Sequence, residues 1–105
     1  MIDSTTKSVN KILIRLTNER WKHITYSHKE ISFTSFKSVL GVVEKPDMVL
    51  LGDCDELLAV SKISRRKQWL VVVYKEDKND GFVITAYVTS DIKWLLKRKV
   101  KWIKK

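Results

Sequence analysis

Two histidines, His23 and His28, are the residues of this chain best suited to proton transfer, because the imidazole pKa lies near neutral pH. They are five positions apart in a segment with helical periodicity, and that spacing turns them about 140° from each other on a regular helix. They therefore cannot both enter one site. His28 shares a helical stripe with Trp21 and Ile24 and is the favoured catalytic candidate, with His23 second. The alternative is that His28 only packs against that stripe.

Three hydroxyl side chains recur along the apolar segment 82–89, which is expected to form a strand. Side chains alternate across a sheet, so this strand has two different faces. The apolar face is expected to hold Phe82, Ile84, Ala86 and Val88. The other face is expected to hold Val83, Thr85, Tyr87 and Thr89. A row of hydroxyls on an open face suits phosphate binding or catalysis, and it is equally common on a solvated strand.

Basic residues dominate the charge of the chain, with 21 Lys and Arg against 12 Asp and Glu and a formal net charge of +9. Seven of the basic residues and one Asp lie in residues 91–105, which therefore carry +6. A surplus of this size favours a polyanionic partner. The residues expected to contact nucleic acid are Arg15, Arg20, Arg65, Arg66, Lys67, Thr89, Lys97, Arg98 and Lys101. The run at 65–67 can also be a solvated turn, and Trp94 and Trp102 either stack on bases or pack on the domain.

No metal site or cofactor is expected. The acidic residues Asp53, Asp55 and Glu56 have no histidine nearby to complete a ligand set. The single cysteine, Cys54, excludes an internal disulfide and a cysteine-based zinc site, and it favours a reducing, cytoplasmic setting. The longest apolar run, Trp69–Tyr74, is far shorter than the roughly 20 residues needed to cross a bilayer, so no membrane-spanning role is expected.

The length allows one domain over residues 1–105, with residues 1–10 as a flexible lead-in. Periodicity predicts strands over 11–16, 48–51, 57–63, 69–74 and 82–89, and helices over 18–28 and 33–44. Thr17 suits the cap of the first helix, and Pro46 ends the second. Residues 79–81 (NDG) predict a turn.

The remaining segment, 91–105, is expected to be a basic helix capped by Asp91. Its inward-facing residues would be Ile92, Leu95, Leu96 and Ile103. The fold class is therefore α+β, with two N-terminal helices packed on a mostly antiparallel sheet and a basic C-terminal helix.

Several segments resemble the phage-type PBECR nuclease-like domains of the barnase/EndoU/colicin/RelE-like ribonuclease superfold. Residues 16–24 (LTNERWKHI) and 28–30 (HKE) resemble the opening signature, and residues 81–87 (GFVITAY) resemble the final strand. Residues 46–47 and 71–73 resemble the landmarks between them, so the resemblance spans residues 13–89. The sequence departs from the pattern at Ser27 and Lys29, where the pattern has Arg and Pro, and in the basic tail.

The resemblance implies a small metal-independent ribonuclease, of a toxin-like or mobile-element type, that cleaves RNA such as tRNA. This chemistry needs a base for the 2′-OH proton, an acid for the leaving 5′-oxygen, and donors on the phosphate. We expect His28, or else His23, opposite Thr85 and Tyr87, with Arg65 or Arg15 on the phosphate.

Two other functions fit the same residues. One is a non-catalytic RNA- or DNA-binding module on the same fold. The other is an interaction protein whose basic surface meets an acidic antitoxin or immunity protein. The sequence predicts no particular oligomeric state.

Overall fold

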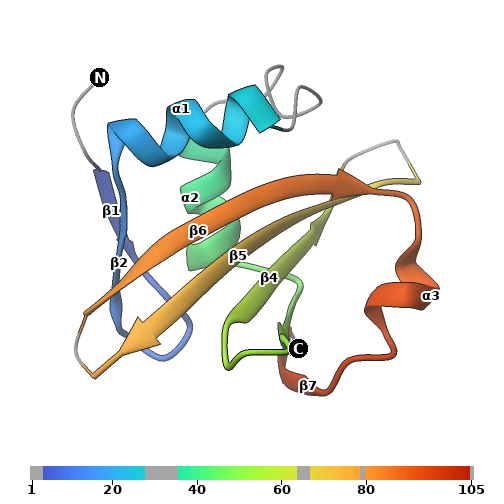
Figure 1. Cartoon of the computed structure of the whole chain (residues 1–105). Helices are drawn as coiled ribbons and strands as arrows, with labels where there is room; N and C mark the ends of the chain where they lie inside the picture. Colours follow the sequence, from blue (N-terminus) through green and yellow to red (C-terminus); the bar gives the residue numbers. More distant parts are fainter. Residues whose placement is uncertain (1–3, 28–35, 64–66, 79, 105) are drawn as a thin grey trace.

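A mixed sheet forms the frame of the molecule in the computed structural model, which describes residues 4–27, 36–63, 67–78 and 80–104 (Figure 1). Within these residues the sheet has seven strands in the order β1-β2-β6-β5-β4-β3-β7. The strands are β1 (Ser4–Lys7), β2 (Leu13–Leu16), β3 (Met48–Leu51), β4 (Leu57–Lys62), β5 (Trp69–Asp77), β6 (Asp80–Thr89) and β7 (Val100–Ile103). The helices are α1 (Asn18–Ser27), α2 (Phe36–Glu44) and α3 (Ile92–Leu95).

Every neighbouring pair of described strands is antiparallel except β2 and β6, which run parallel. The α+β class with a mostly antiparallel sheet is therefore confirmed. Strands β4, β5 and β6 form the expected meander, and β5 and β6 meet in a hairpin where Asp77 pairs with Asp80. Helix α1 begins as predicted, because the backbone N of Arg20 donates to Thr17 Oγ1 at 3.1 Å, the pattern of an N-cap.

The two faces of the sheet are built differently. On the covered face, α1 and α2 pack over the larger core, which includes Ile14, Leu16, Ile24, Val43, Val72, Tyr74, Val83 and Ala86. On the opposite face, here called the α3 face, Leu95 is fully buried against a smaller core. This core includes Met48, Leu50, Leu58, Val60, Val71 and Val73. Figure 1 shows the single turn of α3 on the other side of the strands from α2.

The predicted helix over 91–105 is wrong beyond its first turn. Asp91 caps α3 as expected, since Trp94 N donates to Asp91 Oδ1 at 3.0 Å. The chain then turns and adds β7 to the edge of β3, where Leu51 N donates to Lys99 O at 2.9 Å. Pairing satisfies backbone groups that β3 would otherwise leave open. Leu96 and Ile103, expected to face inward, are 53% and 62% exposed.

The predicted lead-in over residues 1–10 also differs, because it contains β1. This strand pairs with β2, and the Ser8 hydroxyl that follows it is buried and donates to Glu76. Asn10 Nδ2 donates to the other oxygen of Glu76 at 3.0 Å. One carboxylate at the end of β5 thus fixes a polar segment that shows no apolar periodicity in the sequence.

A β-bulge in β6 changes the predicted faces of that strand. Val73 pairs with Thr85 and Tyr74 pairs with Val83, which leaves Ile84 as an extra residue. Val83 is therefore buried on the covered face together with Ala86, and Phe82 is 47% exposed on the α3 face. The predicted places of Phe82, Ile84 and Val83 are wrong for this reason.

Candidate nucleic-acid interface

The predicted catalytic residues do not come together in the described part of the structure. His23 is exposed on α1, whose Ile24 is buried in the core of the covered face. Thr85 and Tyr87 pair with Val73 and Val71, so they lie on the α3 face. The sheet therefore separates His23 from both hydroxyls. His28, the favoured candidate, lies outside the described residues.

The predicted nucleic-acid contacts are distributed over both faces. Arg20 is exposed on α1, and Lys101 lines a hollow of about 290 Å³ beside Trp102 on the covered face. Lys67 is exposed just before β5. Arg65 and Arg66 lie outside the described residues. Lys97 and Arg98 follow α3 and line one hollow, whereas Arg15 points to the α3 face from β2.

Thr89 has a structural role. Its Oγ1 accepts a hydrogen bond from Asp91 N at 3.1 Å, where the chain passes from β6 into α3. Because Asp91 in turn caps α3, the hydroxyl of Thr89 orders the entry to the helix that carries Trp94. The hydroxyl can still donate its proton, so the expected phosphate contact of Thr89 stays a prediction.

A hollow of about 520 Å³ lies between the end of α3 and the turn that joins β3 to β4. Its lining consists of Leu51, Gly52, Asp53, Trp94, Lys97, Arg98 and Lys99. After α3 the chain continues in tight turns, with Arg98 N donating to Leu95 O at 3.1 Å. These turns bring three consecutive basic side chains and an aromatic ring into the same hollow.

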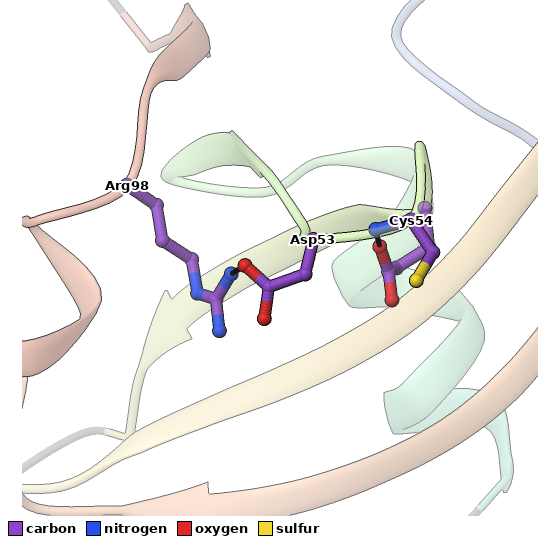
Figure 2. A network of polar contacts seen from close by, with 4 residues as sticks. Asp53, Cys54 and Arg98 are labelled. Atoms are coloured by element: carbon purple, nitrogen blue, oxygen red, sulfur yellow. Dashed lines mark hydrogen bonds and ion pairs between the residues drawn. The ribbon is translucent and has the colours of Figure 1, made fainter.

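Arg98 contacts both sides of this hollow, Trp94 on α3 and Asp53 in the β3–β4 turn, and Figure 2 shows its ion pair with Asp53. Its guanidinium carbon lies 5.0 Å from the centre of the Trp94 ring, and its Nη1 is 3.1 Å from Asp53 Oδ1. The Arg98 side chain is 19% exposed, and its Nε is buried without a hydrogen-bond partner among the described residues. Stacking on Trp94 orients the guanidinium, and the ion pair with the largely exposed Asp53 adds little to its stability.

The acidic turn opposite Arg98 is held by Glu56. Its Oε1 accepts from Cys54 N at 2.7 Å, and its backbone oxygen accepts from Gly52 N at 2.8 Å. A Cβ at position 52 would lie 2.2 Å from Glu56 Oε1, so a side chain there would force the Glu56 carboxylate to move. Glu56 thus shapes the turn, and Asp53 is the carboxylate that faces Arg98 (Figure 2). Among the described residues, no group of three or more His, Cys, Asp and Glu is arranged to hold a metal ion.

Tyr87 lies close enough to Arg98 to be affected by its charge. Burial raises the pKa of the Tyr87 phenol, and the positive charge of Arg98 partly opposes that rise. The phenol therefore stays protonated at neutral pH and can act as a hydrogen-bond donor. This makes it unsuited to remove a proton from an RNA 2′-OH.

Sequence reasoning selected Lys97 and Arg98 but missed their neighbours in the hollow. Lys99 continues the same basic run but was not among the predicted contacts, and the sequence alone does not decide whether Trp94 stacks on bases or packs on the domain. The sequence does contain a local indication of this site. Trp94, on a short helix capped by Asp91, comes three positions before a run of basic residues that begins at Lys97. Asp53 could not be found in this way, because it comes from a turn 45 residues earlier.

No helix among the described residues is both long and apolar enough to pass through a bilayer. Comparison of the chain with protein-family models, with curated proteins and with solved structures found no match. The PBECR resemblance stays a prediction.

Proposed function

We propose that this protein is an RNA-binding module and that the hollow beside α3 is its principal binding site. The observation that carries the proposal is the meeting of Trp94, Arg98, Lys97 and Lys99 around one cavity. An exposed aromatic ring offers a stacking surface for a base, and neighbouring cations offer contacts to phosphate.

The charges of the hollow support an anionic ligand. Lys97, Arg98 and Lys99 contribute three positive charges, and Asp53 contributes one negative charge. Asp53 pairs with Arg98 through Nη1 and is largely exposed, so a phosphate oxygen could displace its carboxylate and accept from the same nitrogen. Lys97 and Lys99 are exposed and add point charges on either side.

Binding is favoured over cleavage because the described residues do not assemble an acid and a base at this site. His23 is on the covered face, and Tyr87 holds its proton. The predicted ribonuclease activity rests on His28 and stays a prediction. The two functions differ in a simple observation: an RNA-binding module leaves its ligand intact, and a metal-independent ribonuclease cuts RNA in EDTA to give 2′,3′-cyclic phosphate ends.

The test is a fluorescence-anisotropy titration of a labelled oligouridine of roughly 12 nucleotides, the length that one small binding surface covers. Three phosphate contacts predict a log–log salt slope of about −2, so the Kd rises about ninefold between about 50 and about 150 mM KCl. A Kd that does not change with salt contradicts the proposal. The same RNA, recovered after incubation in EDTA, shows whether any cleavage has occurred.

Two matched double variants distinguish the contribution of the hollow to RNA affinity from that of the overall positive charge. Lys97→Gln with Lys99→Gln removes two charges at the hollow, and Lys22→Gln with Lys37→Gln removes two from exposed positions on α1 and α2. We expect the first pair to weaken binding by about tenfold and the second by about twofold or less. Equal weakening by both pairs would mean that only net charge matters.

A further inference from the structure

A row of four exposed side chains crosses the α3 face of the sheet. None of these residues lines the hollow beside α3. Thr5 pairs with Arg15, Arg15 with Phe82, and Phe82 with Lys75, so the row runs across β1, β2, β6 and β5. All four residues are exposed. These strand segments lie at the end of the sheet away from α3, towards the β5–β6 hairpin (Figure 1).

The burial of neighbouring residues fixes the side on which this row lies. Ile14 and Leu16 are fully buried on the covered face, so Arg15 between them points the other way. Tyr74 is buried on the covered face, so Lys75 also points away from it. The row is therefore an open surface of the sheet that neither α1 nor α2 covers.

Phe82 is the unusual member of the row. An aromatic side chain in a long central strand is ordinarily buried, yet Phe82 is 47% exposed because the bulge at Ile84 turns Val83 inward in its place. Gly81 fixes the backbone just before it. A Cβ at Gly81 would lie 2.3 Å from Lys75 O and 2.7 Å from Ile14 Cδ1, so β6 approaches both neighbours closely at this point. Phe82 therefore directly follows the position at which β6 is packed closely against β5 and β2.

The charges beside Phe82 identify the kind of ligand that fits. Arg15 and Lys75 stand on the two strands that flank it, each about 5 Å away in the sheet. Among the described residues neither takes part in an ion pair. Asp77 and Asp80 pair two positions closer to the hairpin, so their side chains are on the same face as Phe82. They would repel phosphate at that end. This line of cation, aromatic ring and cation suits an unpaired nucleotide in a strand. Its base can stack on the Phe82 ring, and the phosphates on either side of it can contact Arg15 and Lys75.

We propose that the row Thr5, Arg15, Phe82 and Lys75 is a second RNA site that binds an unpaired nucleotide, with the base stacked on Phe82 and the phosphates at Arg15 and Lys75. The inference extends the proposed function, but it rests on a different patch and has its own test. It assigns single-stranded RNA as the ligand class, because a base inside a duplex does not offer its face to a ring.

The experiment compares Phe82→Leu with Phe82→Tyr, which keeps the aromatic face. Both are titrated by anisotropy against labelled oligouridine and against a labelled RNA duplex of the same length, and circular dichroism melts check their folding. We expect Phe82→Leu to weaken single-strand binding about tenfold and Phe82→Tyr to change it by about twofold or less. Duplex binding should stay within about twofold for both, since its electrostatic contacts are kept.

Arg15→Gln tests the same site without altering the Phe82 ring, because it removes one of the predicted phosphate contacts. Lys37→Gln on α2 is the matched control for loss of one positive charge. Single-strand affinity that is unchanged in both Phe82→Leu and Arg15→Gln overturns the proposal and leaves this patch to a protein partner. The Lys97 and Lys99 double variant distinguishes the two sites. If this double variant weakens binding and Phe82→Leu does not, the result supports RNA binding at the hollow and contradicts the second site. The reverse result keeps the second site and rejects the hollow.

Discussion

The two faces of one sheet differ in how their residues are used. On the covered face, side chains such as Ile14 and Tyr74 are fully buried beneath α1 and α2. On the α3 face, a helix of four residues covers only part of the strands and leaves Phe82 and Trp94 about half exposed. Adjacent positions of one strand therefore have different roles: those on the covered face stabilise the fold, and those on the α3 face leave side chains exposed to solvent.

The largest expected effect contrasts two neighbours on β2. Ile14→Ala removes a fully buried side chain from the covered face and should lower the free energy of unfolding by about 3 kcal/mol. Arg15→Gln, one position along on the open face, should change it by about 0.5 kcal/mol or less. Urea denaturation followed by tryptophan fluorescence measures both. Similar losses in the two variants would break the distinction between the faces.

The next effect concerns binding at the hollow. Trp94→Ala removes the 44% exposed ring on which Arg98 stacks, and it should weaken oligouridine binding about tenfold, a typical cost of losing one base-stacking ring. Tyr26→Ala is the control, because Tyr26 is 83% exposed on α1 and should have no effect on affinity. An equal loss in the control would show that the α3 face has no special role.

A third prediction concerns the buried phenol of the covered face. Tyr74 is fully buried, and its hydroxyl has no hydrogen-bond partner among the described residues. Tyr74→Phe removes this unsatisfied group and should raise the free energy of unfolding by about 1 kcal/mol at neutral pH. A loss of stability in Tyr74→Phe would contradict the absence of a partner and show that the hydroxyl makes a stabilising contact.

The same residue predicts an alkaline pH dependence. Burial, with a smaller contribution from the charge of Glu76, raises the pKa of Tyr74 above its ordinary value. Below about pH 10 the phenol is protonated in both the folded and the unfolded chain, and its titration has no effect. Above that pH only the unfolded chain ionises, so stability falls as pH rises. Tyr74→Phe should reduce this fall, which unfolding curves taken on both sides of pH 10 would reveal.

The smallest effect is at the ion pair of the hollow. Asp53 is 85% exposed, so Asp53→Asn should change the free energy of unfolding by about 0.5 kcal/mol or less. RNA affinity should rise by about twofold, because a negative charge leaves the site and Arg98 is released. Weaker RNA binding in Asp53→Asn would show that the ion pair is needed to position Arg98.

Much of the fold could be predicted where the information is local. Strand β3 was predicted with its exact bounds of 48–51, and α1 begins after Thr17 as its cap requires. The tail could not be predicted in this way. Its apolar residues fit a helical stripe as well as a strand, and only the open edge of β3, far away in sequence, favours pairing over the helix.

The candidate site was predictable to a similar extent. Composition and charge selected Lys97 and Arg98, since a basic run is visible in the sequence. The bulge that exposes Phe82 depends on how β5 and β6 pair, and strict alternation therefore gave the wrong face. The proposed pairing of His23 with Thr85 and Tyr87 failed because periodicity shows which side of a helix is apolar but not which face of the sheet that helix covers.

The most direct test of the account is ultraviolet crosslinking of the wild-type protein to oligouridine, with the crosslinked residues identified by mass spectrometry. Both faces carry exposed aromatic side chains, with Phe82 and Trp94 on the α3 side and Tyr26 on α1. We expect crosslinks at Phe82 and Trp94 that are lost when unlabelled RNA competes. Crosslinks concentrated at Tyr26 or elsewhere on α1 and α2 would contradict it.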